Sequence, residues 1–216
     1  MKNTGVFRFS GTLDAGIIED YSYLLPESLS SASLNRKNEF ITGRYCAIKA
    51  AASININIKD IGFSSKRAPI WPKDVVGSIS HKNNQFVAIT ALSKIYKSVG
   101  VDIEKIIDHK KEKAIDRMIL TENDKLFLQN ISNEIQLLKT IIFSAKESLY
   151  KLIYPLVEVY FDFKEADFIS INFESMIFEI SLNSEKEVLK PFNGTYSGIF
   201  EISDNDYIIT TLLLTN

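Results

Sequence analysis

The stretch Phe143-Ser-Ala-Lys-Glu-Ser-Leu-Tyr-Lys151 lies within a pattern that predicts a helix from about Glu134 to Tyr154, which Pro155 helps to end. At 3.6 residues per turn, Phe143, Glu147 and Lys151 lie on one face of this helix, one turn apart. A separate apolar stripe consists of Ile142, Ala145, Leu149, Leu152 and Ile153. The helix can therefore pack on one side and present the Glu147 carboxylate between Lys146 and Lys151 on another. An ordinary Glu–Lys pair on a solvated helix, worth about 0.2–0.5 kcal/mol, is the alternative interpretation.

A second pair of carboxylates, upstream of this helix, favours a functional site. In Val99-Gly-Val-Asp-Ile-Glu104, the strand period of two places Asp102 and Glu104 on one face of the strand. Adjacent like charges on a strand are unfavourable unless a positive group lies between them, and a hard divalent cation is the usual solution. The alternative is the polar outer face of an antiparallel strand, because short motifs often match by accident.

The composition is that of an ordinary globular chain. The 216 residues, 45% of them hydrophobic, suffice for one large domain or two small lobes. A net charge of −2 excludes a global basic field for nucleic acid. The single cysteine, Cys46, lies in a helical pattern and is expected to be buried, which fits a reducing compartment. We expect a cytoplasmic protein, because the chain shows no apolar signal core and no apolar run of membrane-spanning length.

Basic side chains mark the first half of the chain. A helix is expected from about Leu34 to Ile54, with an N-cap from the Ser-rich residues 28–33. Arg36 and Arg44 are two turns apart, off the apolar stripe of this helix, and could face one anion. Solvated helix charge is the alternative. A proline-containing loop projects Lys66 and Arg67, and His81 ends a strand, where a histidine usually just faces solvent.

The order of elements predicts an α+β fold. Each half reads as one long helix followed by short strands, at residues 75–81, 86–92 and 98–104 and then at 168–173, 176–182, 194–202 and 207–214. We predict a pseudo-two-fold pair of similar lobes, each a long helix packed on a small, mainly antiparallel sheet. The N-terminal lobe would comprise residues 1–104 and the C-terminal lobe residues 105–216, with the active site in the cleft between them.

Three motifs together resemble a known family. Gly77-Ser-Ile-Ser-His81, Gly100-Val-Asp-Ile-Glu104 and the stretch from Phe143 to Lys151, in this order and at these separations, resemble the 4′-phosphopantetheinyl transferase superfamily. The Arg44 helix and Arg67-Ala-Pro-Ile-Trp-Pro72 are similar to its siderophore-synthetase branch. The resemblance implies a monomeric pseudo-dimer that transfers the phosphopantetheine arm of coenzyme A to a serine of an apo peptidyl, aryl or acyl carrier protein. Adenosine 3′,5′-bisphosphate would be released.

The resemblance also implies roles for individual residues. Asp102, Glu104 and Glu147 would ligate Mg²⁺ bound to the coenzyme A pyrophosphate, and Mn²⁺ suits the same all-oxygen site. Glu147 would also deprotonate the serine, directly or through water, and Lys151 would neutralise charge on the leaving phosphate. Lys146 and His81 would hold phosphate oxygens, so His81 joins the catalytic set. Contacts to the 3′-phosphate and adenine end would come from Arg36, Arg44, Lys66 and Arg67, and a hydroxyl from Ser80.

Two other interpretations belong to different classes of protein. One is a protein of the same fold that binds coenzyme A or a carrier protein without catalysing transfer. The other is a structural protein in which the charge pairs are incidental. The three acidic positions together with Lys151 favour the enzyme, because a pure binder has no need of a metal site. The basic residues 105–113, next to the acidic strand, are expected to dock an acidic carrier-protein helix.

Overall fold

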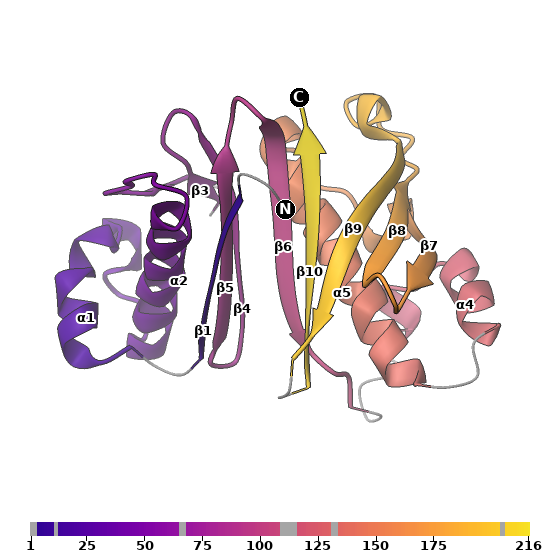
Figure 1. Cartoon of the computed structure of the whole chain (residues 1–216), viewed down its shortest axis with the longest axis horizontal. Coiled ribbons are helices and arrows are strands. Elements are labelled where there is room, and N and C mark those ends of the chain that lie inside the picture. Colours follow the sequence, from indigo (N-terminus) through magenta and orange to yellow (C-terminus); the bar gives the residue numbers. More distant parts are fainter. Residues whose placement is uncertain (1–3, 11–12, 65–67, 109–115, 131–133, 204–205) are drawn as a thin grey trace. The chain divides into compact units, whose positions relative to one another are not determined.

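The structure is a computed structural model that describes residues 4–10, 13–64, 68–108, 116–130, 134–203 and 206–216. It divides into two units, one formed by Met1–Val101 with Leu214–Asn216 and the other by Asp102–Leu213. Helices and antiparallel sheets occur in both (Figure 1), so the predicted mixture of helices with antiparallel sheet is confirmed. The lobe boundary at residue 104 and the pseudo-two-fold relation stay predictions.

The first unit is organised around helix α2 (Leu34–Ala52), which confirms the helix predicted there. The Ser33 side chain accepts a hydrogen bond from the backbone N–H of Arg36 at 3.3 Å, so a serine does cap this helix. Small residues of α2, among them Cys46 and Ala50, are fully buried and belong to one core with Phe86. Burial raises the pKa of the Cys46 thiol to about 12, and the predicted burial of this cysteine is confirmed.

Helix α2 packs on a three-stranded antiparallel sheet with the strand order β1-β5-β4 (Figure 1). The strands are β1 (Thr4–Ser10), β5 (Gln85–Leu92) and β4 (Val75–Lys82). Strand β5 lies in the centre and is buried along six consecutive residues, which explains its continuous apolar run. The shorter elements of this unit are α1 (Ala15–Asp20), η1 (Ser22–Leu24), η2 (Glu27–Leu29), β2 (Gly62–Phe63) and β3 (Pro69–Ile70).

Gly5 of β1 sets how closely this strand approaches α2. A Cβ atom at Gly5 would lie 1.9 Å from the backbone oxygen of Ala50, and backbone cannot move aside as a flexible side chain can. We expect Gly5→Ala to lower the free energy of unfolding by about 1–3 kcal/mol, the usual range for overpacking. Chemical denaturation measures this loss. Gly16→Ala in α1 is the control, because its Cβ would meet only Asp14 Oδ1 at 3.3 Å and alanine favours a helix. Equal stability of the two variants would contradict the close packing.

The second unit contains the long helix α5 (Ile135–Val157) and a five-stranded sheet in the order β6-β10-β9-β8-β7 (Figure 1). The strands are β6 (Tyr96–Lys105), which enters this unit at Asp102, β7 (Ala166–Asn172), β8 (Ile177–Leu182), β9 (Gly194–Ile202) and β10 (Tyr207–Thr215). Leu149 of α5, Phe178 of β8 and Phe200 of β9 are fully buried, so the core lies between the helix and the sheet. All five predicted strands are present.

Helix α5 does not end where the sequence predicts. It continues through Pro155 to Val157 and stops at Glu158, which has a left-handed backbone with φ of 51°. Proline lacks an N–H group, so Pro155 removes one hydrogen bond, to the carbonyl of Lys151. Because Pro155 lies in the last turn, only this one hydrogen bond is lost, and the helix tolerates the loss. The prediction of an end at Tyr154 was therefore wrong by one turn.

Helix α4 (Glu122–Gln129) precedes α5. It begins with a capping box, in which the Thr121 side chain accepts from the N–H of Asp124 and the Asp124 side chain accepts from the N–H of Thr121. The described residues of this unit also form two short 3-10 helices, η4 (Phe163–Glu165) and η5 (Lys190–Phe192). Among the described helices, none combines the length and apolar character that a membrane span requires.

Candidate functional site

Asp102 forms the centre of a charged cluster in the second unit. Its side chain is only 4% exposed, and two residues of α5 contact it. Lys151 Nζ donates to Asp102 Oδ1 at 2.7 Å, and Ser144 Oγ donates to Asp102 Oδ2 at 2.9 Å. A buried carboxylate is stable only when it is paired and hydrogen-bonded, and both conditions are met here. The cluster thus joins the acidic strand to the helix that the sequence singles out.

A chain of hydroxyl groups holds α5 against β10 beside this cluster. Ser144 Oγ lies 2.9 Å from Thr210 Oγ1, which in turn lies 2.6 Å from Ser148 Oγ. Ser148 also donates to the carbonyl of Thr210 at 3.0 Å. All three residues are buried, and their hydrogen bonds tie this side of the helix to the strand.

Glu147 belongs to the same face of α5 as the residues that contact Asp102. It follows Ser144 by three positions and precedes Lys151 by four, and residues three and four apart are neighbours on a helix. Glu147 and Glu104 are both partly exposed. Across the part of the chain that the structure describes, no three His, Cys, Asp or Glu residues are grouped closely enough to hold a metal ion. The oxygen donors do match in kind what a hard divalent cation requires.

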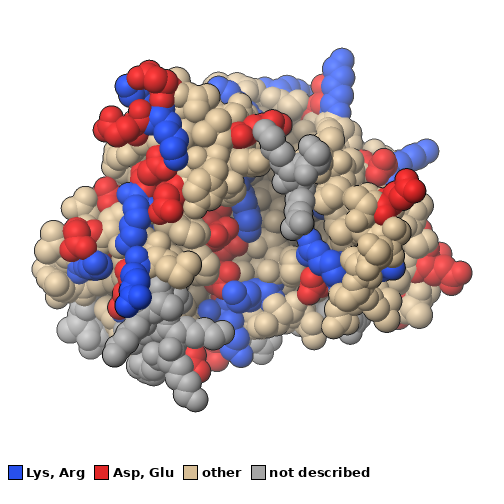
Figure 2. Space-filling view, turned by 180° about the vertical axis from the view of Figure 1, so that it is seen from behind, with Lys and Arg blue, Asp and Glu red and all other residues tan. Residues whose placement is uncertain are grey.

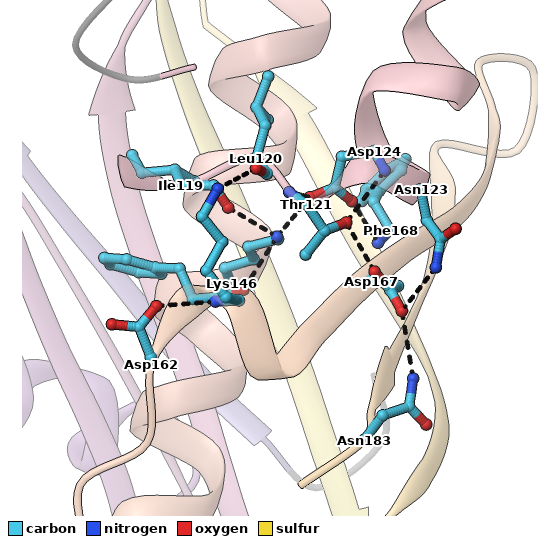
Figure 3. Close-up of polar contacts among 12 residues, drawn as sticks. Ile119, Leu120, Thr121, Asn123, Asp124, Lys146, Asp162, Asp167, Phe168 and Asn183 are labelled. Atoms are coloured by element: carbon cyan, nitrogen blue, oxygen red, sulfur yellow. Dashed lines mark hydrogen bonds and ion pairs between the residues drawn. The ribbon is translucent and has the colours of Figure 1, made fainter. Parts of the chain in front are cut away.

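Lys146 does not have the place expected from the sequence. It is 1% exposed, and its ammonium group donates to Asp124 Oδ2 at 2.5 Å, the Ile119 carbonyl at 2.9 Å and the Phe163 carbonyl at 3.0 Å (Figure 3). An ammonium group has three protons, so all of them are used within the protein. The expectation that Lys146 holds a phosphate oxygen is corrected on this ground.

Asp124 is the partner that makes this burial of Lys146 tolerable. It is fully buried, and besides Lys146 it accepts from the N–H groups of Thr121 and Phe168, each at 2.8 Å. Desolvation lowers the pKa of Lys146, and the charge of Asp124 opposes that shift. The sequence analysis missed Asp124, although the capping pattern that begins at Thr121 could have marked it.

A second buried lysine lies two turns earlier on α5. Lys139 is 8% exposed at its side chain and pairs with Asp116 at 2.7 Å. Both residues line a cavity of about 250 Å³ together with Leu120, Lys125, Leu128, Gln129 and Ile135. The sequence analysis did not single out this pair, because its two members are far apart in the chain.

Aromatic residues lie beside Glu147 on the same helix. The ring of Tyr150 stacks on Tyr154 at 5.1 Å and contacts Phe161 at 5.2 Å. Burial, together with the charges of Tyr154, Tyr160 and Glu147, raises the pKa of Tyr150 to about 12. The phenol therefore stays neutral near pH 7, and the sequence analysis gave it no role.

In the first unit, Arg44 is buried rather than solvated. It is 6% exposed, its guanidinium lies 4.3 Å above the ring of Phe40, and its Nε has no hydrogen-bond partner among the described residues. Desolvation, partly opposed by Asp60 and assisted by Arg36, lowers the pKa of Arg44 to about 10. Arg36 is exposed and pairs with Glu39 at 3.4 Å. That Arg36 and Arg44 face one anion stays a prediction.

The remaining candidates of the first unit lie on β4 or outside the described residues. His81 is partly exposed and stacks on Phe86, with ring centroids 5.4 Å apart. Ser80 is buried beside it. Lys66 and Arg67 lie outside the described residues. Figure 2 shows that, on the face it presents, described Lys and Arg side chains are interspersed with Asp and Glu, so recognition of an acidic partner there depends on local groups.

Two family models match the chain. The model of the 4′-phosphopantetheinyl transferase N-terminal domain matches residues 25–91. The model of the 4′-phosphopantetheinyl transferase superfamily matches residues 98–212, more than half of the chain. The second range contains Asp102, Ser144, Glu147 and Lys151, so the charged cluster lies within the matched region.

Curated proteins that are named as 4′-phosphopantetheinyl transferases, or as enterobactin synthase component D, are similar to this chain in sequence. Enterobactin synthase component D of Salmonella typhi is 37% identical over 142 residues, which cover 64% of this chain and 58% of that protein. The 4′-phosphopantetheinyl transferase Npt of Nocardia iowensis is 32% identical over 131 residues, 61% of this chain and 58% of that protein. For PptT of Mycobacterium tuberculosis the identity is 28% over 171 residues, 73% and 74% of the two chains. The matched part thus spans less than two thirds of the first two relatives.

Proposed function

This chain belongs to the 4′-phosphopantetheinyl transferase superfamily, and from that membership we propose that it transfers the 4′-phosphopantetheine group of coenzyme A to a serine of an apo carrier protein. The other product is adenosine 3′,5′-bisphosphate. The observation that carries the proposal is the cluster in which Lys151 and Ser144 of α5 hold the buried Asp102, with Glu147 between them on the helix face. A carboxylate and an ammonium group side by side suit a reaction that moves a proton and neutralises phosphate charge.

The carrier is proposed to be a peptidyl or aryl carrier domain of a siderophore or nonribosomal peptide synthetase. The similarity to proteins named enterobactin synthase component D supports this choice. A monomer is proposed, because one chain supplies the whole set of candidate residues. The expected cytoplasmic location stays a prediction.

The reaction begins with attack of the serine Oγ on the β-phosphorus of the coenzyme A pyrophosphate. The bond from that phosphorus to the bridging oxygen breaks, and adenosine 3′,5′-bisphosphate leaves. Glu147 takes the serine proton, because a serine hydroxyl is a poor nucleophile near neutral pH. Lys151 stabilises the negative charge that develops on the leaving phosphate. Asp102 orients Lys151 through the 2.7 Å contact.

The acidic residues of the site offer carboxylate oxygens, which are the kind of donor that a divalent cation prefers. Asp102, Glu104 and Glu147 would hold Mg²⁺, and Mn²⁺ would suit the same oxygen donors. Such a cation would neutralise the charge of the pyrophosphate. Lys151 would then share Asp102 with the cation, as a carboxylate has two oxygens and several acceptor positions.

The phosphate and adenine contacts are proposed to come from the first unit. Arg44 is the strongest candidate, because a buried guanidinium with an unpartnered Nε has unused capacity to donate to a phosphate. The other proposed contacts to the phosphates and adenine are Arg36, His81 and Ser80. Lys66 and Arg67, which lie outside the described residues, are proposed on the sequence alone. Lys146 is left out, since its three protons are used within the protein.

Intact-mass spectrometry tests the proposal. An apo peptidyl carrier domain is incubated with the protein, coenzyme A and Mg²⁺, in parallel with a sample that contains a chelator. The expected result is a gain of one phosphopantetheine mass on the carrier, which the chelator prevents. If several unrelated carriers gain no mass while coenzyme A still binds, the protein is a binder and the proposal is wrong.

Carrier docking is proposed to use the basic residues that follow Glu104. Lys110, Lys111 and Lys113 lie outside the described residues, and the prediction rests on the sequence alone. Replacing all three with Glu is expected to raise the carrier KM at least about tenfold, because like charges then repel the acidic carrier helix. Coenzyme A affinity, measured by calorimetry, should not change. Unaltered carrier kinetics would show that docking occurs elsewhere.

A further inference from the structure

The buried ion pair of Lys146 and Asp124 joins three separate stretches of the second unit at one point: residues 119–124, helix α5 and residues 163–168 (Figure 3). Lys146 comes from α5 and Asp124 from α4, and they bond to the backbone at Ile119, Phe163 and Phe168. These backbone groups lie before α4, in η4 and in β7. The neighbourhood is tied further by Thr121, whose hydroxyl donates to Asp167 at 2.6 Å.

Stability alone does not account for this arrangement. Removing two charges from water is costly, and well-packed apolar residues in place of a buried ion pair often serve stability equally well. What the pair adds is direction, since each of its hydrogen bonds has a required geometry. A fully satisfied buried network of this kind holds the participating segments in one arrangement.

The position of Lys146 next to Glu147 connects this network to the candidate site. On the side that faces the sheet, α5 is held by Ser144 and Ser148 through Thr210. On the side that faces α4 and η4, it is held by Lys146. Glu147 lies between Lys146 and Ser148 in the sequence of the helix, and Lys151 follows Glu147 by one turn.

We infer that the Lys146–Asp124 pair is a positioning device that sets the rotation and axial position of α5, and through it the placement of Glu147 and Lys151. The inference rests on the function proposed above, because that proposal assigns Glu147 and Lys151 to the reaction. Lys146 itself is assigned no contact with substrate or metal, because its three protons are used within the protein. A displacement of about 1 Å at reacting groups can lower a rate about a hundredfold, so such a device would matter for turnover.

Three variants separate positioning from stability. Lys146→Met removes the ammonium group and leaves the Asp124 carboxylate buried without its partner. The double variant Lys146→Met with Asp124→Asn removes both charges and keeps the shapes of the side chains. Lys139→Met is the matched control, because Lys139 is also a buried, ion-paired lysine of α5 but lies two turns before Lys146.

The first measurement compares Tm, kcat and the coenzyme A Kd of the folded proteins. Lys146→Met is expected to lower both Tm and kcat. The double variant should regain part of the lost Tm, because the unpaired charge is gone although the Asn NH2 then faces one backbone N–H, and its kcat should stay at least about 30-fold below wild type. Lys139→Met should lower Tm and keep kcat, and the Kd should stay within about threefold throughout. Recovery of kcat together with Tm would overturn the inference. A Kd raised more than about tenfold with kcat retained would make Lys146 a phosphate contact, and would overturn it too.

The second measurement does not depend on transferase activity. Hydrogen exchange of the α5 amides between Ser144 and Lys151 is compared with that of β8 in the same sample, which reports global opening. The double variant should exchange at least about tenfold faster in α5 relative to β8, whereas Lys139→Met should not change the ratio there. An unchanged ratio in the double variant would overturn the inference. If wild type transfers nothing to any carrier, the proposed function fails, and the exchange ratio still decides the positioning role.

Discussion

Replacing Glu147 with Gln is expected to lower the transfer rate at least about 10³-fold, because general-base catalysis alone contributes about 10²–10⁴ and the same carboxylate is proposed to bind the cation. Gln has almost the same shape as Glu, so the helix should stay intact. The measurement is the initial rate of carrier loading at saturating coenzyme A, with Tm recorded for each protein.

Glu174→Gln is the control for this substitution. Glu174 is exposed in the turn between β7 and β8, and the change should leave the rate within about twofold of wild type. A titration with Mg²⁺ adds a second reading, since a lost ligand should raise the concentration needed for half-maximal activity. If Glu147→Gln keeps more than a tenth of the wild-type rate, Glu147 is neither the base nor a necessary ligand.

Replacing Asp102 with Asn is expected to lower both stability and activity. Lys151 is 25% exposed at its side chain and loses the carboxylate charge that lies 2.7 Å from its ammonium group, so we expect a loss of about 1–3 kcal/mol in the free energy of unfolding. The transfer rate should fall at least about 100-fold, because Lys151 is no longer held in place. Urea denaturation and carrier loading measure the two effects.

The double variant Asp102→Asn with Lys151→Met distinguishes the two effects. Removing both charges should recover part of the lost stability, and the stability effects of the single changes should therefore not add, with a coupling of about 0.5–3 kcal/mol. The rate should not recover, since Lys151 is proposed to neutralise the leaving phosphate. Additive stability losses would contradict the ion pair, and a recovered rate would contradict the role of Lys151.

Periodicity in the sequence predicted the main elements correctly. The period of 3.6 identified α2 and α5, and the period of two, with turn residues between the runs, identified strands of both sheets. Where the prediction of α5 failed, at Pro155, the reason was positional. Proline interrupts a helix strongly in its interior, but in the last turn few hydrogen bonds remain to be lost.

The buried charges show where sequence reasoning reached its limit. Arg44 stands off the apolar stripe of α2, and a solvated charge was the simpler interpretation, yet it is buried over Phe40. Helical periodicity states which face a residue occupies and contains no information about what covers that face. The covering segments come from elsewhere in the chain, so burial is decided by tertiary packing.

The sequence by itself determined the family, the two long helices, the strands from residue 75 onward, and the residues that carry the proposed chemistry, because motifs and periodicities are local. Only the tertiary structure decided how the lysines of α5 differ. Lys151 reaches Asp102 at the site, whereas Lys146, five positions earlier, is enclosed by Asp124 and two carbonyl groups. The physical reason is that a lysine can be buried only where distant parts of the chain supply a carboxylate and acceptors for its protons.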